Sequence, residues 1–138
     1  MNNIEKAKEL LKDDLTCVLV KDDIVYTSKA RGIAPVLNYL NEKVDLNGFS
    51  VADRIVGKAA AFLFVNAGIK EVYTEVLSVK GKEILEKYNI PYEYKTLVDK
   101  IINRTGDDIC PMEKTVQDVD DPKIAYELLD AKIKSLRK

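Results

Sequence analysis

Short apolar runs alternate with helical patterns along the chain. β-Branched and apolar residues at 15–20 and 24–27, separated by a polar turn at 21–23, predict two strands joined as a hairpin. Similar runs at 69–77 and 92–94 predict two further strands. Apolar residues at helical spacing predict helices at 4–11, 33–41, 50–67, 78–88 and 97–102, a short helix opening at Cys110 and a last helix beginning at 120–122.

The helix expected over residues 50–67 is the central one. Every residue from Ala59 to Val65 is apolar, and a helix that is apolar on all sides is buried. Ser50 can cap its N-terminus, with Asp53 three residues later in a pattern that resembles a capping box. Gly68 suits the left-handed backbone position that ends many helices.

Strands that alternate with helices and are joined by short loops pair in parallel, with right-handed crossovers. We therefore expect an α/β fold of three layers, α/β/α, with a mixed sheet that opens with the antiparallel hairpin. The length of 138 residues fits a single domain, residues 1–138, around one core.

The composition excludes several kinds of chemistry. The chain has no histidine and only two cysteines, Cys17 and Cys110, which excludes a Ser–His–Asp triad, a Cys–His pair, a histidine-ligated zinc and a four-cysteine metal site. We expect no metal and no cofactor.

The 22 basic and 23 acidic residues leave a net charge of −1, which gives no long-range attraction to nucleic acid or to an anionic membrane. No apolar run has the length of a membrane span, and two reduced cysteines favour the cytoplasm.

Two longer strings carry a resemblance to a known family. They are Asp53-Arg54-Ile55-Val56-Gly57-Lys58-Ala59-Ala60-Ala61 and Asn103-Arg104-Thr105-Gly106-Asp107-Asp108-Ile109-Cys110-Pro111-Met112-Glu113. Both are similar to a small microbial family known only as a domain of unknown function, with a cytidine-deaminase-like fold. The similarity extends over nearly the whole chain. It implies the fold and no established activity.

The catalytic motif of the zinc deaminases is missing. Those enzymes place His or Cys, then Ala, then Glu at the start of the central helix, and Cys-x-x-Cys at the start of the next helix. In an alignment by eye, 56–58 (Val-Gly-Lys) replaces the first motif and 78–81 (Ser-Val-Lys-Gly) replaces the second. No metal ligand remains, and lysine stands in place of the general-acid carboxylate. Zinc-dependent deamination is therefore not expected.

Three residues of the first half are candidates for contact with a ligand, each with a structural alternative. Lys58 could bind an anion or form a Schiff base, or it could extend to solvent or pair with Asp53 or Glu113. Asp53 could orient a ligand hydroxyl, or it could cap the central helix. Ser78 lies where a strand ends and a helix begins, a place that suits both an N-cap and an anion contact.

Four residues of the second half are further candidates. Cys110 at a helix start could be a nucleophile or an inert thiol, and Glu113 in the same helix could carry a proton or reach back to the cap. Asn103 and Arg104 could form a polar lip at a binding site, since arginine binds phosphate and carboxylate well. Arg104 could equally pair with the acidic residues that follow it.

These residues favour a soluble domain that binds a small anionic or nucleotide-like ligand. The predicted ligand-binding set is Asp53, Lys58, Ser78, Asn103, Arg104, Cys110 and Glu113. Two alternatives stay open: a metal-free enzyme with Cys110 or Lys58 as nucleophile and Glu113 or Asp53 as proton carrier, and a non-catalytic interaction module. Association into homo-oligomers, through a sheet edge or through helices, is also open.

Overall fold

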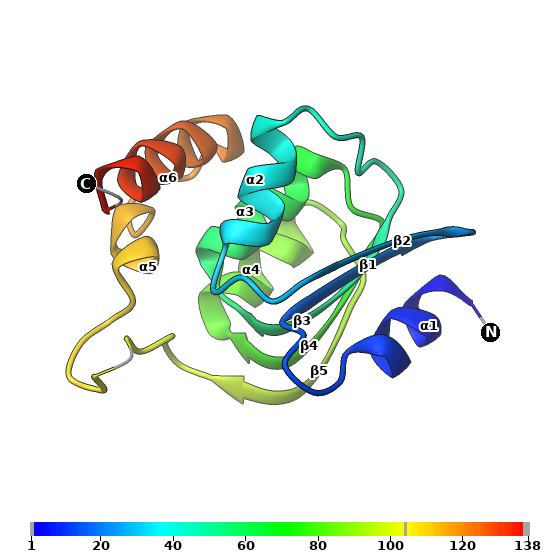
Figure 1. Ribbon diagram of the computed structural model, residues 1–138. Helices are drawn as coiled ribbons and strands as arrows, with labels where there is room; N and C mark the ends of the chain where they lie inside the picture. Colours follow the sequence, from blue (N-terminus) through cyan, green and yellow to red (C-terminus); the bar gives the residue numbers. More distant parts are fainter. Residues whose placement is uncertain (1, 104, 137–138) are drawn as a thin grey trace.

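The computed structural model describes residues 2–103 and 105–136. Its elements follow the order α-β-β-α-β-α-β-α-β-α-α (Figure 1). They are α1 (Asn3–Leu10), β1 (Cys17–Lys21), β2 (Ile24–Ser28), α2 (Ala34–Asn41), β3 (Ser50–Val56), α3 (Lys58–Ala67), β4 (Glu71–Ser78), α4 (Val79–Lys87), β5 (Tyr92–Val98), α5 (Pro111–Thr115) and α6 (Pro122–Leu136).

The five strands form one mixed sheet in the order β2-β1-β3-β4-β5. β1 pairs antiparallel with both β2 and β3, whereas β3, β4 and β5 are parallel to one another. Figure 1 shows α1 on one face of the sheet and α2, α3 and α4 on the other. The predicted α/β fold, with its opening hairpin and three layers, is confirmed.

Helix α3 lies at the centre of the larger core, as its apolar sequence predicts. Phe62, Leu63 and Phe64 are fully buried between the sheet and the neighbouring helices. The helix ends at Gly68, whose φ of +73° is the left-handed conformation expected there. α6 packs against α3 from outside, and α5 contacts both helices.

The start predicted for the central helix is wrong. Residues Ser50–Val56 form strand β3, and α3 begins only at Lys58. Asp53 therefore lies inside a strand and caps no helix. Pairing with β1 on one side and β4 on the other buries β3, and this tertiary pairing overrides the local helix-cap pattern. Arg54 is accommodated by a 2.8 Å ion pair with Glu75 on the adjacent strand.

The helix predicted at 97–102 is also wrong. β5 continues to Val98 because it pairs in parallel with β4 along its length, as far as Ser78 opposite Val98. Beyond it, Ile102 forms an isolated antiparallel bridge with Ile109.

None of the helices in 2–103 and 105–136 combines the length and the apolar character that crossing a membrane requires.

Candidate ligand-binding site

The carboxyl ends of the parallel strands β3 and β4 lead directly into helices α3 and α4. One residue, Gly57, separates β3 from α3, and Ser78 ends β4 immediately before α4. The two helix starts are in close contact, since a Cβ atom on Gly81 would lie 2.9 Å from the carbonyl carbon of Gly57. In open α/β sheets, ligands bind outside such strand ends.

Glu113 of α5 caps the N-terminus of α3. Its carboxylate accepts hydrogen bonds from the backbone N–H groups of Lys58 and Ala59, each 2.8 Å long. Gly57 leaves room for it, because a Cβ atom there would lie 2.0 Å from Oε1 of Glu113. Burial raises the pKa of Glu113, and the two N–H groups together with the Lys58 ammonium oppose this rise. Glu113 thus caps α3, and the expectation that it reaches back to the start of its own helix is wrong.

Ser78 caps α4, as one of the two interpretations of this residue requires. Its Oγ accepts a hydrogen bond of 3.0 Å from the N–H of Gly81, and the residue is 1% exposed. The side chain also lines a cavity, so that the cap and a ligand contact do not exclude each other.

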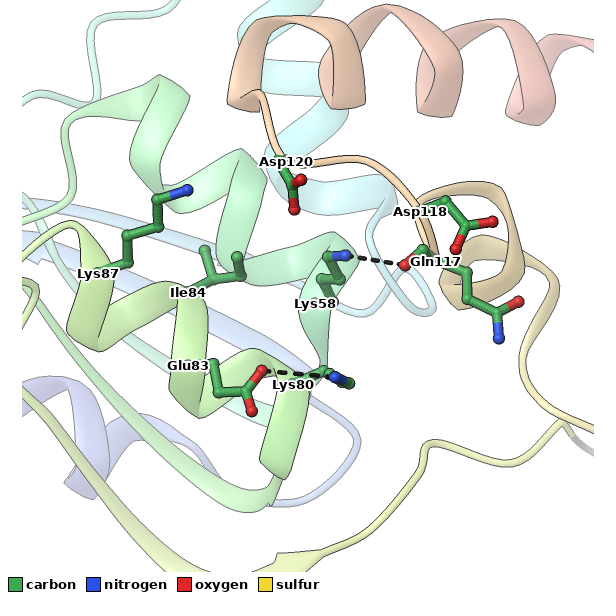
Figure 2. A pocket seen from close by; sticks show the side chains of 8 residues that line it. All are labelled: Lys58, Lys80, Glu83, Ile84, Lys87, Gln117, Asp118 and Asp120. Atoms are coloured by element: carbon green, nitrogen blue, oxygen red, sulfur yellow. Dashed lines mark hydrogen bonds and ion pairs between the residues drawn. The ribbon is translucent and has the colours of Figure 1, made fainter.

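Two adjoining cavities open at these helix starts and share Lys58, Lys80 and Gln117. The smaller cavity, of about 150 Å³, has a mainly apolar wall. It is lined by Lys58, Ser78, Lys80, Asp99, Lys100, Ile101, Ile109, Glu113 and Gln117. The larger cavity, of about 400 Å³, is open and mainly polar (Figure 2). It is lined by Lys58, Lys80, Glu83, Ile84, Lys87, Gln117, Asp118 and Asp120.

Lys58 is the first residue of α3 and lines both cavities. Its ammonium donates a 3.0 Å hydrogen bond to the main-chain oxygen of Gln117, and it lies 5.7 Å from the centroid of the Phe62 ring. Figure 2 shows this contact between the start of α3 and the segment after α5. The hydrogen-bond partner of the Lys58 ammonium is therefore a neutral carbonyl, and the predicted ion pair with Asp53 or Glu113 is not formed.

The other two lysines of the larger cavity are weakly paired. Lys80 lies 3.6 Å from Glu83, and both side chains are exposed by more than half of their surface. The Lys87 ammonium lies 5.5 Å from the centroid of the Tyr88 ring. Exposed ion pairs of this kind contribute about 0–1 kcal/mol, so that a ligand can replace them at low cost.

Three other predicted residues, Asp53, Asn103 and Cys110, line neither cavity. Asp53 is buried in β3, opposite Cys17 and Thr74, and burial raises the pKa of its carboxyl to about 7. Asn103 lies in the loop after β5, where its side-chain oxygen accepts a 2.9 Å hydrogen bond from the N–H of Gly106. Cys110 is half-buried and lines neither cavity. Arg104 lies outside the described residues.

The sequence did not predict most of the cavity residues that lie around α5. Lys100, Ile101, Ile109, Gln117, Asp118 and Asp120 come from the segments that flank α5. Apart from Ile109, which lies in the 103–113 string, no motif marks them, because they reach the site through the docking of α5 against the start of α3. Lys80 could have been found, since it lies in the 78–81 string at a predicted helix start.

A metal centre is not formed by the groups present. Among residues 2–103 and 105–136, no three His, Cys, Asp or Glu side chains are arranged so that they could hold a metal ion. The position that the resemblance assigns to two metal ligands holds Ser78 and Gly81, which bond to each other.

The sequence profile of a family described as "TM1506: Domain of unknown function (DUF1893)" matches residues 5–133. The chain belongs to this family. The family resemblance found in the sequence is therefore confirmed.

A solved structure of the same family has the same fold. A DUF1893 family protein (TM1506) from Thermotoga maritima is 26% identical, with a TM-score of 0.85 over 95% of this chain and 90% of that chain. A dCMP deaminase from the cyanophage S-TIM5 in apo form is distantly similar, with 12% identity and a TM-score of 0.46 over 67% of this chain and 93% of that chain. None of the curated proteins compared with the chain matches it.

Proposed function

We propose that the two adjoining cavities bind one small anionic, nucleotide-like ligand. Its anionic group contacts Lys58, Lys80 and Lys87 in the larger cavity. Its flat apolar part enters the smaller cavity between Ile101 and Ile109. The observation that carries the proposal is the junction of a charged cavity and an apolar cavity through the shared residue Lys58.

The partners of the three lysines support an anion in the larger cavity. Lys58 donates to a neutral carbonyl, Lys87 lies over a neutral ring, and the ion pair of Lys80 is loose and exposed. A phosphate or carboxylate would gain charge-assisted hydrogen bonds from these ammonium groups without breaking a strong ion pair. The volume of about 400 Å³ lies in the range of roughly 300–1,000 Å³ found for small-molecule sites.

The wall of the smaller cavity supports a ring with a polar edge. Ile101 and Ile109 supply apolar contact, while Ser78 and Glu113 supply a hydroxyl and a carboxyl to the same cavity. Both oxygens of Glu113 accept a backbone N–H at the start of α3, so the carboxyl is held in place and offers a ligand its remaining acceptor positions. Ligand sites of this kind combine an apolar wall with a few polar groups that fix orientation.

The covalent alternative has less support from the geometry. Cys110 lines neither cavity, whereas Lys58 lines both. Lys58 is therefore the only one of the two predicted nucleophiles that a ligand in the proposed site would touch. Reduction with borohydride in the presence of a carbonyl compound would trap a Schiff base at Lys58 if this alternative holds.

Isothermal titration calorimetry with four probes tests the proposal. CMP, cytidine, ribose 5-phosphate and inorganic phosphate separate the contribution of the ring from that of the phosphate. We expect CMP to bind more tightly than cytidine or ribose 5-phosphate, because it alone occupies both cavities. If none of the probes binds, or if all phosphates bind equally, the proposed division of the site is wrong.

Variants on α4 locate the binding. Lys80→Ala should weaken CMP binding by about fivefold, the equivalent of about 1 kcal/mol for one exposed charge contact. Lys82→Ala is the matched control, because Lys82 lies on the same helix and lines neither cavity. Lys58→Met should abolish the rise in melting temperature that CMP produces. Equal effects of the Lys80 and Lys82 substitutions would indicate nonspecific charge attraction.

A further inference from the structure

Strand β5 forms an open edge of the sheet. It is the last strand in the order β2-β1-β3-β4-β5, and no other strand formed by residues 2–103 and 105–136 pairs with its outer side (Figure 1). Residues 93–97 are all exposed, including Tyr94 at 37% and Leu97 at 40%. A seven-residue edge with unpaired backbone groups is a template for pairing with another strand.

The register with β4 fixes which backbone groups of β5 face outward. The N–H of Val72 donates to the carbonyl oxygen of Pro91 over 3.0 Å, and Val72 is the register partner of Tyr92. In a parallel ladder, the residues on either side of a register partner make the hydrogen bonds. Glu93 and Lys95 therefore direct their backbone groups towards β4, whereas Tyr92, Tyr94 and Thr96 direct theirs to the open edge.

The residues on either side of Tyr94, Glu93 and Lys95, carry opposite charges, and their side chains lie on the same face of the sheet as each other. Glu93 lies on the face covered by α1, where its carboxylate accepts a 2.7 Å hydrogen bond from Lys8. Side chains of a strand alternate between faces, so that Lys95 lies on that face as well. No ion pair of Lys95 is found within the described ranges 2–103 and 105–136.

We propose that the protein forms a two-fold homodimer through antiparallel pairing of β5 with β5 of a second copy, centred on Tyr94. A two-fold interface must be complementary to itself, and this register makes it so. Glu93 then lies opposite Lys95 of the second copy, and Lys95 lies opposite its Glu93. The outward backbone groups of Tyr94 pair with their own copies, and the two sheets become one sheet of ten strands.

Competing registers lack this complementarity. A two-fold axis at Glu93 places the two glutamates opposite each other, and an axis at Lys95 places the two lysines opposite each other. Like charges in directly opposite positions destabilise a strand pair. The other sheet edge, β2, has no charged residue between Ile24 and Ser28, so that no charge pair selects a register there.

Exchange of the two charges tests the dimer and its register together. In Lys95→Glu, two attractive pairs become two repulsive ones, and the same is true of Glu93→Lys. We expect each variant alone to dissociate about thirtyfold more readily than the wild type in analytical ultracentrifugation. An equimolar mixture should form a heterodimer, because each strand then faces opposite charges at both positions.

Several results would overturn the proposal. The first is a wild type that stays monomeric at 200 µM, a concentration of about 10⁻⁴ M that exceeds the Kd of ordinary specific dimers. The others are charge variants that dimerise as well as the wild type, and a mixture of the two variants that fails to associate. A further variant blocks the pairing of the two β5 strands without disturbing the fold, which separates loss of the dimer from misfolding. Tyr94→Pro removes an N–H that faces the open edge, together with the ring that stacks on Tyr92 with centroids 6.3 Å apart, but it removes no N–H of the ladder with β4. The strand content seen by far-UV circular dichroism should therefore be retained. This variant should be monomeric, and a dimeric Tyr94→Pro would also contradict the pairing.

Discussion

Replacement of Gly57 by alanine should displace the Glu113 carboxylate from the start of α3. The new Cβ atom would lie 2.0 Å from Oε1 and 2.6 Å from Cδ of Glu113, and 2.9 Å from Cγ1 of Ile101. The backbone itself is no obstacle, because φ at Gly57 is −111°, which alanine adopts freely. The cost therefore arises from the contact and from the hydrogen bonds that the carboxylate must give up.

The magnitude follows from those hydrogen bonds. Glu113 accepts two bonds of 2.8 Å from N–H groups at a helix start. Hydrogen bonds to charged groups contribute about 1.5–3 kcal/mol each, and the raised pKa of Glu113 indicates that burial offsets part of this gain. We therefore expect Gly57→Ala and Glu113→Ala each to lower the free energy of unfolding by about 2–4 kcal/mol, which is a large effect for a single substitution.

A double-mutant cycle in urea at pH 7 is the assay. Once Glu113 is alanine, the two nearest contacts of the Cβ atom at position 57 are gone and Cγ1 of Ile101 at 2.9 Å remains, so the second substitution should cost far less than the first. The coupling energy should be about 1–3 kcal/mol. Strict additivity of the two changes would refute the contact between Gly57 and Glu113.

Rescue by a small anion gives a second readout of the same contact. Acetate can occupy the place that Glu113→Ala vacates, because helix starts bind anions. The melting temperature of Glu113→Ala should therefore rise with acetate more than that of Glu127→Ala, an exposed glutamate on α6. Equal responses of the two variants would mean that acetate acts nonspecifically.

Three further predictions concern other parts of the chain. Burial raises the pKa of Asp53 from 3.8 to about 7, so the folded state binds this proton more tightly than the unfolded state. The free energy of unfolding should therefore fall by about 4 kcal/mol as the pH rises from about 4 to 7. Asp53→Asn should remove this part of the pH dependence in urea unfolding curves, and an unchanged difference between pH 5 and pH 8 would contradict it. Ellman's reagent should modify the half-buried Cys110 in the native protein and reach Cys17, which is fully buried with a raised pKa, only after unfolding. Gly68→Ala should lower stability by at least about 1–2 kcal/mol, because φ is +73° and the new Cβ would lie 2.4 Å from Oδ1 of Asn47; a calorimetric melting temperature equal to that of the wild type would exclude this strain.

The local pattern of the sequence was sufficient for the elements that a single segment determines. The wholly apolar run of α3, its glycine terminator at Gly68 and the serine cap of α4 are read from adjacent residues, and the structure confirms all three. The opening hairpin is confirmed for the same reason, because its strands are neighbours in the chain.

The wrong predictions concern residues whose structure or role depends on segments far away in the sequence. Ser50–Val56 resembles a capped helix start, yet two neighbouring strands pair with it, and Glu75 neutralises Arg54 inside the sheet. The role of Glu113 could not be found either, since a residue 55 positions after Lys58 caps the helix that Lys58 begins. For the same reason, Lys58, Ser78 and Glu113 line the cavities, whereas Asp53, Asn103 and Cys110 do not.

Amide chemical shifts in a titration with CMP test the central claim most directly. If the ligand binds at the joined cavities, the ¹H–¹⁵N correlation spectrum should change at the starts of α3 and α4 and around Gln117, with Lys58, Ala59 and Lys80 among the largest shifts. The signals of β2, at the opposite edge of the sheet, and of α1, on its other face, should stay in place. An unchanged spectrum at millimolar CMP, or shifts confined to any other surface, would contradict the proposed site.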